Sequence, residues 1–278
     1  MQKSLLYIFL FIVVVSCSRC NGPADNGSGD EQVTNTTVQP PPSINYSIVK
    51  VYPHDTSSYT QGLFLNGDKL YEGTGQPGHS KLALIDLASG KPKQEVKINP
   101  SEFGEGIAML NGKIYQLTWQ NNIVHVYDAA TFKKIQDFSW PFEGWGLSTD
   151  GKNLIISTGS SNLYYVNPDS FKIIKQIGVT DNYGPVAMIN ELEFINGFVY
   201  ANQYETNYIL KIDTASGNVA GRMDCTDILT KSGMSYNPAM YELQTGNVLN
   251  GIAYNPSANS LYITGKLWPA LFEIRLSQ

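Results

Sequence analysis

The chain has 278 residues, of which 42% are hydrophobic and 15% are charged, and its formal net charge is -5. A chain of this length can bury a sizeable core, and the lack of any Lys or Arg cluster argues against nucleic acid as a partner. The three cysteines and three histidines are scattered, without the spacing of zinc ligands.

The first seventeen residues predict an exported lipoprotein. Lys3 is followed by an apolar stretch from Leu5 to Val15, and then by a serine and Cys17. A basic start and a short apolar stretch are typical of a secretory signal, and the stretch is too short for an ordinary membrane span. A small residue before a cysteine resembles the lipobox of bacterial lipoproteins, although Val14 stands where that pattern usually has Leu. We therefore expect a signal peptide over residues 1–17, lipidation of Cys17 and a membrane anchor at the bacterial cell envelope, on the periplasmic or cell-surface side. Release as a free secreted protein is the alternative.

Residues 18–43 predict a disordered tether. The segment is rich in Gly, Asn, Thr and Pro and ends near three consecutive prolines. Such a composition has almost no apolar surface to bury, so it should not fold on its own. Residues 44–278 are left for a single domain, which the tether would hold away from the membrane.

From residue 44 onward, short apolar runs repeat with a long period. Five times a polar residue and its neighbour open such a run, and the spacings between openings are 44, 38, 47 and 60 residues. The five openings are Gln61-Gly62, Glu105-Gly106, Glu143-Gly144, Asn190-Glu191 and Asn250-Gly251. A period of this size is typical of repeat architectures.

Each opening is followed by further runs that predict short antiparallel strands. In the first repeat the second run begins at Leu70, the third extends from Leu82 to Leu87 and the fourth from Gln94 to Ile98. A turn signature beginning with Asp or Asn precedes the fourth run in the first four repeats. Four such strands per repeat indicate an all-β protein, a five-bladed β-propeller.

The fifth repeat has only three runs, and we expect the segment Tyr46 to Tyr52 to supply its fourth strand. This pairing would close the ring and leave no open sheet edge. A closed propeller has little need of a partner, so a monomer is expected. A β-sandwich with irregular strands is the alternative fold.

The five openings should gather around one mouth of the central channel, where Gln61, Glu105, Glu143, Asn190 and Asn250 would point inward. Aromatic residues lie close to them in sequence, which together predicts a concave site with aromatic walls. A carboxylate buried there would have a raised pKa, which suits proton transfer near neutral pH. Composition alone does not choose between Glu105 and Glu143. Alternatively, the polar residues only bind channel water, and the aromatic residues only wedge the blades together.

Eight motifs run in order through the five repeats, from roughly Val49 to Leu276. They are Tyr59-Thr60-Gln61-Gly62-Leu63, Tyr71-Glu72-Gly73-Thr74-Gly75, Phe103-Gly104-Glu105-Gly106-Ile107, Leu117-Thr118-Trp119, Glu143-Gly144-Trp145-Gly146-Leu147, Asn190-Glu191-Leu192-Glu193, Leu249-Asn250-Gly251-Ile252-Ala253 and Thr264-Gly265-Lys266-Leu267-Trp268-Pro269. Together they resemble the plant-type glutaminyl-peptide cyclotransferases, a glutamine cyclotransferase family that bacteria also possess.

The resemblance implies a five-bladed propeller and an enzyme that forms N-terminal pyroglutamate from the N-terminal Gln of peptides or proteins. Glu105 matches the catalytic carboxylate of the family, which would take a proton from the α-amine and return it to the departing ammonia. Asn190 and Lys266 match positions that would bond the amide oxygen as negative charge develops on it. The other matching positions would bind the substrate or form the pocket walls, namely Gln61, Phe103, Trp119, Trp145 and Tyr204.

Three points stay open on the sequence alone. Tyr204 stands where the family usually has Trp, which puts the pocket shape and the substrate preference in doubt. Glu72 and Glu143 are competing carboxylates for the catalytic role. The family resemblance also admits a calcium ion in the channel, since the Asn and Glu side chains offer hard oxygen ligands, but no acidic loop motif requires one. The alternative function is a non-catalytic propeller that binds peptide or glycan at the same mouth.

Overall fold

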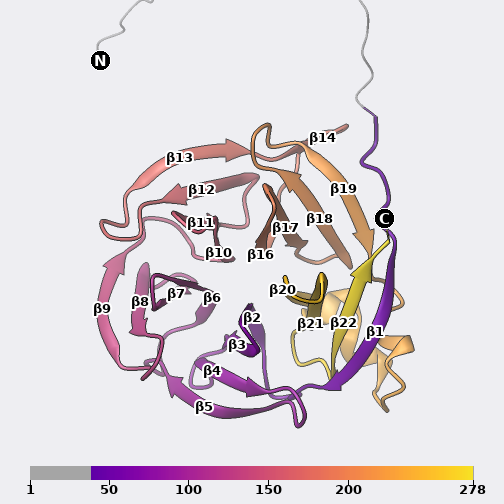
Figure 1. Cartoon of the computed structure of the whole chain (residues 1–278), viewed down its shortest axis with the longest axis horizontal. Coiled ribbons are helices and arrows are strands. Elements are labelled where there is room, and N and C mark those ends of the chain that lie inside the picture. The colour runs from indigo at the N-terminus through magenta and orange to yellow at the C-terminus, as the bar shows by residue number, and fades with distance from the viewer. Residues whose placement is uncertain (1–38, 278) are drawn as a thin grey trace, which may run out of the picture. The chain divides into compact units, whose positions relative to one another are not determined.

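A computed structural model describes residues 39–277, which form a closed ring of five four-stranded antiparallel sheets (Figure 1). The predicted five-bladed propeller is therefore confirmed. The expected signal peptide over residues 1–17, the lipidation site at Cys17 and the tether as far as residue 38 lie outside the described residues.

Each blade is one sheet whose strands follow one another from the channel to the rim. Blade 1 holds β2 (Thr60–Asn66), β3 (Lys69–Thr74), β4 (Lys81–Asp86) and β5 (Lys91–Lys97). Blade 2 holds β6 (Gly104–Leu110), β7 (Lys113–Thr118), β8 (Ile123–Asp128) and β9 (Lys134–Ser139). Blade 3 holds β10 (Leu147–Thr149), β11 (Leu154–Ser157), β12 (Asn162–Val166) and β13 (Ile173–Gly178). Blade 4 holds β16 (Ile189–Ile195), β17 (Phe198–Gln203), β18 (Tyr208–Asp213) and β19 (Val219–Asp224).

Blade 5 combines the first described strand with the last three. From the channel outward it holds β20 (Leu249–Asn255), β21 (Ser260–Gly265), β22 (Ala270–Leu276) and β1 (Tyr46–Pro53). The register of β1 against β22 extends from Tyr46 opposite Leu276 to Pro53 opposite Ala270, which confirms the predicted closing strand. Arg222 in β19 also donates its backbone N–H to the Pro42 carbonyl, so contact with the ring begins two residues before the predicted boundary at residue 44.

Two insertions interrupt the regular order of the blades. A two-stranded hairpin of β14 (Thr180–Asp181) and β15 (Gly184–Pro185) precedes blade 4. Three short 3-10 helices precede blade 5: η1 (Leu229–Lys231), η2 (Pro238–Tyr241) and η3 (Leu243–Thr245). The second insertion accounts for the longest spacing between openings in the sequence.

The hydrophobic core lies between neighbouring blades. Inner strands such as β6 are almost wholly buried, whereas rim strands such as β9 are almost wholly exposed. The turns that connect the third and fourth strands follow the sequence signature, because Asp128 and Asp213 each accept backbone N–H groups of their own turn through Oδ1.

A buried ion pair fixes the junction of blades 1 and 5. Both ring nitrogens of His54 face acceptors, with Nε2 3.0 Å from Glu72 Oε1 and Nδ1 2.7 Å from the Trp268 carbonyl oxygen. Thr60 Oγ1 donates to the same Glu72 oxygen at 2.6 Å. Burial alone would lower the pKa of His54, but the adjacent carboxylate raises it. Burial alone would raise the pKa of Glu72, but the imidazolium and its hydrogen bonds lower it.

Replacing His54 by Ala is expected to lower the free energy of unfolding by about 3–5 kcal/mol, because Glu72 would be left buried without its counter-ion. Urea denaturation measures the change. Lys93→Ala is the control, since its ion pair with Asp86 is exposed and should contribute less than about 1 kcal/mol.

The stabilisation by the buried pair should be fully present between the ordinary pKa values of 4.5 for Glu and 6.5 for His. It should be lost as pH falls through the lowered pKa of Glu72 or rises through the raised pKa of His54. Equal losses for the two variants would contradict the prediction.

Candidate active site

The inner strands of four blades begin with a β-bulge, and the bulge places a polar residue at the channel mouth. The strand register shifts between Thr60 and Gly62, between Gly104 and Ile107, between Ile189 and Leu192 and between Leu249 and Ile252. The residues within these shifts include Gln61, Glu105, Asn190 and Asn250. A bulged residue leaves the regular ladder, so its side chain can be aimed differently from those of the strand that follows.

Blade 3 departs from the predicted alignment, because Glu143 does not take the equivalent place. A Cβ added to Gly106 would lie 2.4 Å from the backbone N of Leu147 and 2.7 Å from the Trp145 carbonyl oxygen, and one added to Gly146 would lie 2.0 Å from the Asn190 carbonyl oxygen. Gly146 is therefore the glycine of blade 3 at which the backbones of neighbouring blades come close together around the channel. Trp145 directly precedes it and occupies the position at which the other blades have a polar residue. The prediction that Glu143 lines the mouth is wrong. It failed because two glycines, at 144 and 146, both fit the sequence pattern.

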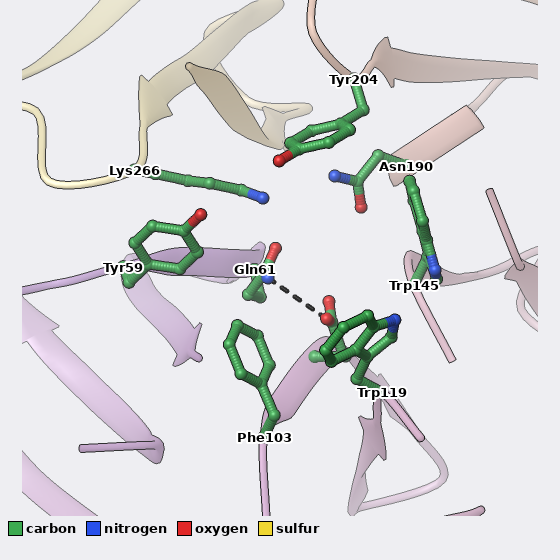
Figure 2. Close-up of a pocket in the computed structure, with 9 residues that line it drawn as sticks. Tyr59, Gln61, Phe103, Trp119, Trp145, Asn190, Tyr204 and Lys266 are labelled. Atoms are coloured by element: carbon green, nitrogen blue, oxygen red, sulfur yellow. Dashed lines mark hydrogen bonds between the residues drawn. The ribbon is translucent and has the colours of Figure 1, made fainter. Parts of the chain in front are cut away.

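A cavity of about 210 Å³ opens at this mouth. All eight residues predicted to catalyse or bind lie around it, together with one residue to which the sequence assigned no role (Figure 2). The lining residues are Tyr59, Gln61, Phe103, Glu105, Trp119, Trp145, Asn190, Tyr204 and Lys266. The missed residue, Tyr59, directly precedes the bulge of β2, and its place in the first motif was the available signal.

Glu105 is the buried carboxylate of the pocket, with only 5% of its surface exposed. Burial raises its pKa well above the ordinary value, Lys266 partly offsets this rise, and Glu143 adds to it. Gln61 Nε2 donates to Glu105 Oε1 at 3.2 Å. Gln61 is itself oriented by Asn250, whose Nδ2 donates to Gln61 Oε1 at 3.1 Å and to the Thr60 carbonyl oxygen at 2.9 Å. Asn250 thus fixes which end of the Gln61 amide faces the carboxyl group.

Lys266 brings the positive charge to the pocket from the turn between β21 and β22. Its Nζ lies 4.4 Å from the ring centroid of Tyr204 and 4.9 Å from that of Tyr59, within the range of cation–π attraction. Burial lowers the pKa of Lys266 to about 8, although Glu105 acts to raise it. None of the ion pairs found among residues 39–277 includes Lys266. Its ammonium protons are therefore free to bond a ligand.

The aromatic residues form two groups of walls. Phe103 contacts Tyr59 and Trp119 edge to face, with ring centroids 6.1 and 5.8 Å apart, and Trp145 contacts Tyr204 in the same manner at 5.6 Å. Figure 2 shows these rings around the space between Gln61, Lys266 and Asn190, and Glu105 lines the same cavity. Trp268, which is also near an opening in sequence, packs instead into the core of blade 5.

A family model described as "Glutamine cyclotransferase" matches residues 23–276. The chain belongs to the glutamine cyclotransferase family. It is 36% identical over 236 residues to the glutaminyl-peptide cyclotransferase of Arabidopsis thaliana, covering 83% of this chain and 71% of that protein. It is also similar to the crystal structure of Myxococcus xanthus glutaminyl cyclase, with a TM-score of 0.76 and 34% identity, covering 85% of this chain and 98% of that one. The structural likeness extends over nearly all of the neighbour, so it concerns the whole ring and not one blade.

Glycines at the ends of second strands make room for the aromatic walls of this cyclotransferase. A Cβ added to Gly75 would lie 2.2 Å from the ring of Phe103, and one added to Gly159 would lie 2.6 Å from the indole of Trp145. Each glycine follows a threonine, as does Gly265 beside Trp268. This repeated Thr-Gly pair was a signal in the sequence for where aromatic rings pack.

Gly75→Ala is expected to raise the KM for substrate about tenfold, because the added methyl group displaces the Phe103 ring and overpacking costs about 1–3 kcal/mol. Initial rates of ammonia release over a range of substrate concentrations measure the change. Gly178→Ala is the control, since a Cβ there would meet no atom closer than 4.0 Å. An unchanged KM in Gly75→Ala would show that the Phe103 wall does not contact the substrate.

Some of the channel side chains bear on the calcium ion that the family resemblance admits. The part of the chain that the structure describes holds no group of three or more His, Cys, Asp or Glu residues that could bind one. Glu191, which lies on the channel, already accepts the backbone N–H of Leu63 at 3.1 Å and of Ile252 at 2.8 Å, one on each carboxyl oxygen. Calcium in the channel stays a prediction of the sequence.

Proposed function

We propose that the protein converts the N-terminal Gln of peptides and proteins into pyroglutamate and releases ammonia, with Glu105 as the proton carrier. One observation carries the assignment of Glu105. It is the only carboxylate that lines the pocket among the described residues, and it is buried opposite the Lys266 ammonium. Family membership supports the reaction, and the chemistry of the pocket supports the roles that follow.

The reaction needs one proton to change place twice. The α-amine nitrogen of the substrate attacks its own side-chain amide carbon, which forms the lactam C–N bond, and the bond from that carbon to the amide nitrogen breaks. Glu105 accepts the proton that the attacking amine loses and returns it to the departing nitrogen, which leaves as ammonia. Burial raises its pKa well above the ordinary value, which makes this carboxylate a better proton acceptor than an exposed one. Since nucleophile and electrophile belong to one residue, holding them in the reactive geometry supplies much of the rate.

Two donors are placed to stabilise the negative charge on the amide oxygen. The Lys266 ammonium and the Asn190 side-chain amide both project into the pocket (Figure 2). Asn190 is 2% exposed, and its Oδ1 has no hydrogen-bond partner within the described chain, so that oxygen is available to the α-amine. Fixed donors in a dry site stabilise a developing oxyanion more strongly than water does.

The remaining pocket residues bind the substrate and exclude water. The apolar walls around the substrate Gln side chain are Phe103, Trp119, Trp145 and Tyr204. Gln61 forms hydrogen bonds to the substrate backbone and also donates one to Glu105. Exclusion of water matters because hydrolysis of the same amide would yield Glu instead of pyroglutamate.

Ammonia release from a Gln-initiated dipeptide amide tests the proposal, with mass spectrometry of the product. Pyroglutamate formation shows a loss of ammonia without uptake of water, which distinguishes cyclisation from hydrolysis. Binding of the peptide without turnover would instead support the alternative of a non-catalytic binding propeller.

The proposal extends to the location of the enzyme. The basic and apolar start of the sequence and the Ser-Cys pair before the tether support export and lipidation at Cys17, which would hold a monomeric propeller at the bacterial cell envelope. Among residues 39–277, no helix is long and apolar enough to cross a membrane. Radiolabelled palmitate incorporation into the wild type and into Cys17→Ala tests the anchor.

A further inference from the structure

A carboxylate behind the pocket holds the indole nitrogens of two of its walls. Glu143 Oε2 accepts the Nε1–H of Trp119 at 2.8 Å and that of Trp145 at 3.0 Å, and its Oε1 accepts Gln120 Nε2 at 2.9 Å. Glu143 does not line the cavity itself. In Figure 2 the two indole nitrogens point to the same side, away from Gln61 and Lys266. The carbon surfaces of both indoles are thereby left to face the substrate space.

The two indoles come from different blades and differ in how firmly other contacts hold them. Trp145 precedes β10, is partly buried and packs against Gly159 and Tyr204. Trp119 lies in the turn between β7 and β8, is 38% exposed, and contacts only Phe103 among the aromatic rings of the described chain. The hydrogen bond to Glu143 is therefore the main restraint on the orientation of Trp119.

The backbone around Glu143 is itself fixed. Trp140 Nε1 donates to the Glu143 carbonyl oxygen at 3.2 Å, and the N–H of Gly144 donates to the carbonyl oxygens of Thr118 and Trp119 at 3.2 and 3.1 Å. The carboxylate and the turn that carries Trp119 thus form one hydrogen-bonded unit. Such a unit can set the position of a pocket wall from outside the pocket.

Glu143 is held as an anion without a cationic partner. None of the ion pairs within residues 39–277 includes it. Partial burial acts to raise its pKa, but the hydrogen bonds from Gln120, Trp145 and Trp119 lower it below the ordinary value. An ionised carboxylate only accepts hydrogen bonds, and bonds to an ionised acceptor are shorter and stronger than neutral ones. The charge therefore serves to orient the donors around it.

We propose that Glu143 is a positioning residue that fixes the Trp119 and Trp145 walls and so determines how tightly the N-terminal Gln residue binds. The proposal rests on the proposed cyclotransferase function. The indole walls contact the substrate equally in its ground state and in its transition state, so their loss affects KM more than kcat. The proton transfer by Glu105 should continue once substrate is bound.

The test compares Glu143→Gln with wild type in steady-state ammonia release. A glutamine side chain has one acceptor oxygen in place of two, and its NH₂ group would face either the two indole N–H groups or Gln120 Nε2. In the first case both indoles lose their acceptor, and in the second the neutral amide oxygen accepts more weakly than the carboxylate. We expect KM to rise about tenfold while kcat changes much less, as for the loss of uniform binding. Glu205→Gln is the matched control, because Glu205 is exposed, adjoins Tyr204 and makes no side-chain hydrogen bond to either indole. It should leave both constants near wild type.

A double-mutant cycle with Trp119→Phe separates positioning from a general loss of stability. Phe keeps an aromatic face but has no N–H, so Glu143→Gln should raise KM less in the Trp119→Phe background than in wild type. Additive effects, an unchanged KM, or a fall in kcat alone in Glu143→Gln would overturn the proposal while leaving the cyclotransferase function intact.

If wild type forms no pyroglutamate, the proposed function fails instead. Acrylamide quenching of tryptophan fluorescence would then decide, with increased quenching in Glu143→Gln supporting the positioning role and unchanged quenching overturning it.

Discussion

Glu105→Gln should reduce kcat for ammonia release by about 10²–10⁴-fold, the usual contribution of a general acid–base group. The variant keeps the shape of the side chain and removes only its ability to exchange a proton. Gln61 still has an acceptor in the new amide oxygen, so the pocket geometry should persist. Because the change removes a buried carboxyl group that has no counter-ion within bonding distance in the described chain, the melting temperature should not fall.

Glu193→Gln is the matched control for this loss. Burial raises the pKa of Glu193 to about 8, so it is also a carboxyl group with an elevated pKa inside the ring. It accepts the backbone N–H of Tyr254 at 2.8 Å and lines a separate cavity that shares no residue with the active site. Its variant should retain activity close to wild type. A full rate in Glu105→Gln would show that another group carries the proton, even though pyroglutamate is formed.

Lys266→Met should reduce kcat by about 10²–10³-fold, comparable to the loss of one oxyanion donor. Methionine fills a similar volume and keeps contact with the Tyr59 and Tyr204 rings, but it offers no proton to the amide oxygen. Lys175→Met is the control, since Lys175 also lies over a tyrosine ring, 4.0 Å from the centroid of Tyr165, but on the exposed rim strand β13. The control should retain its activity.

The pH dependence of kcat is a second measurement for Lys266→Met, because each limb of the profile should change in a defined direction. In wild type, activity should rise as Glu105 ionises and fall near pH 8, where Lys266 loses the proton that stabilises the oxyanion. Without Lys266 the falling limb should disappear. The rising limb should move to higher pH, because the ammonium acts to lower the pKa of Glu105. A falling limb that stays at the same pH in the variant would assign it to a different group.

Local sequence patterns were sufficient to predict the ring of blades. Hairpin turns are specified by neighbouring residues, as in the turns that begin at Asp128 and Asp213, and alternating apolar runs specify strands. The closing role of Tyr46–Pro53 followed from counting strands. The pocket members were predicted because they precede or follow those strands at repeated positions, and the roles proposed for them came from the family resemblance.

Features that depend on contacts between distant residues could not be predicted in the same way. The pair of His54 with Glu72 joins side chains from a loop and a strand, and His125 likewise lies between Glu102 and Asp137, with nitrogen–oxygen distances of 2.8 and 2.7 Å. The place of Glu143 depended on which of two glycines approaches the next blade. Sequence spacing gives no measure of such an approach, which is set by the packing of Gly146 against the backbone of Asn190.

The pairing of β1 with β22 also constrains the order in which the protein can fold. Tyr46 lies opposite Leu276, so the first described strand has no partner until the last one has been synthesised. Blades 1 to 4 contain only consecutive strands and can form as the chain appears, whereas blade 5 waits for both ends. Closing so long a loop adds an entropic cost that grows only slowly with length, but contacts between distant residues slow folding. The exposed backbone edges of β1 and β22 are therefore the part of the nascent molecule most in need of protection from pairing with other chains.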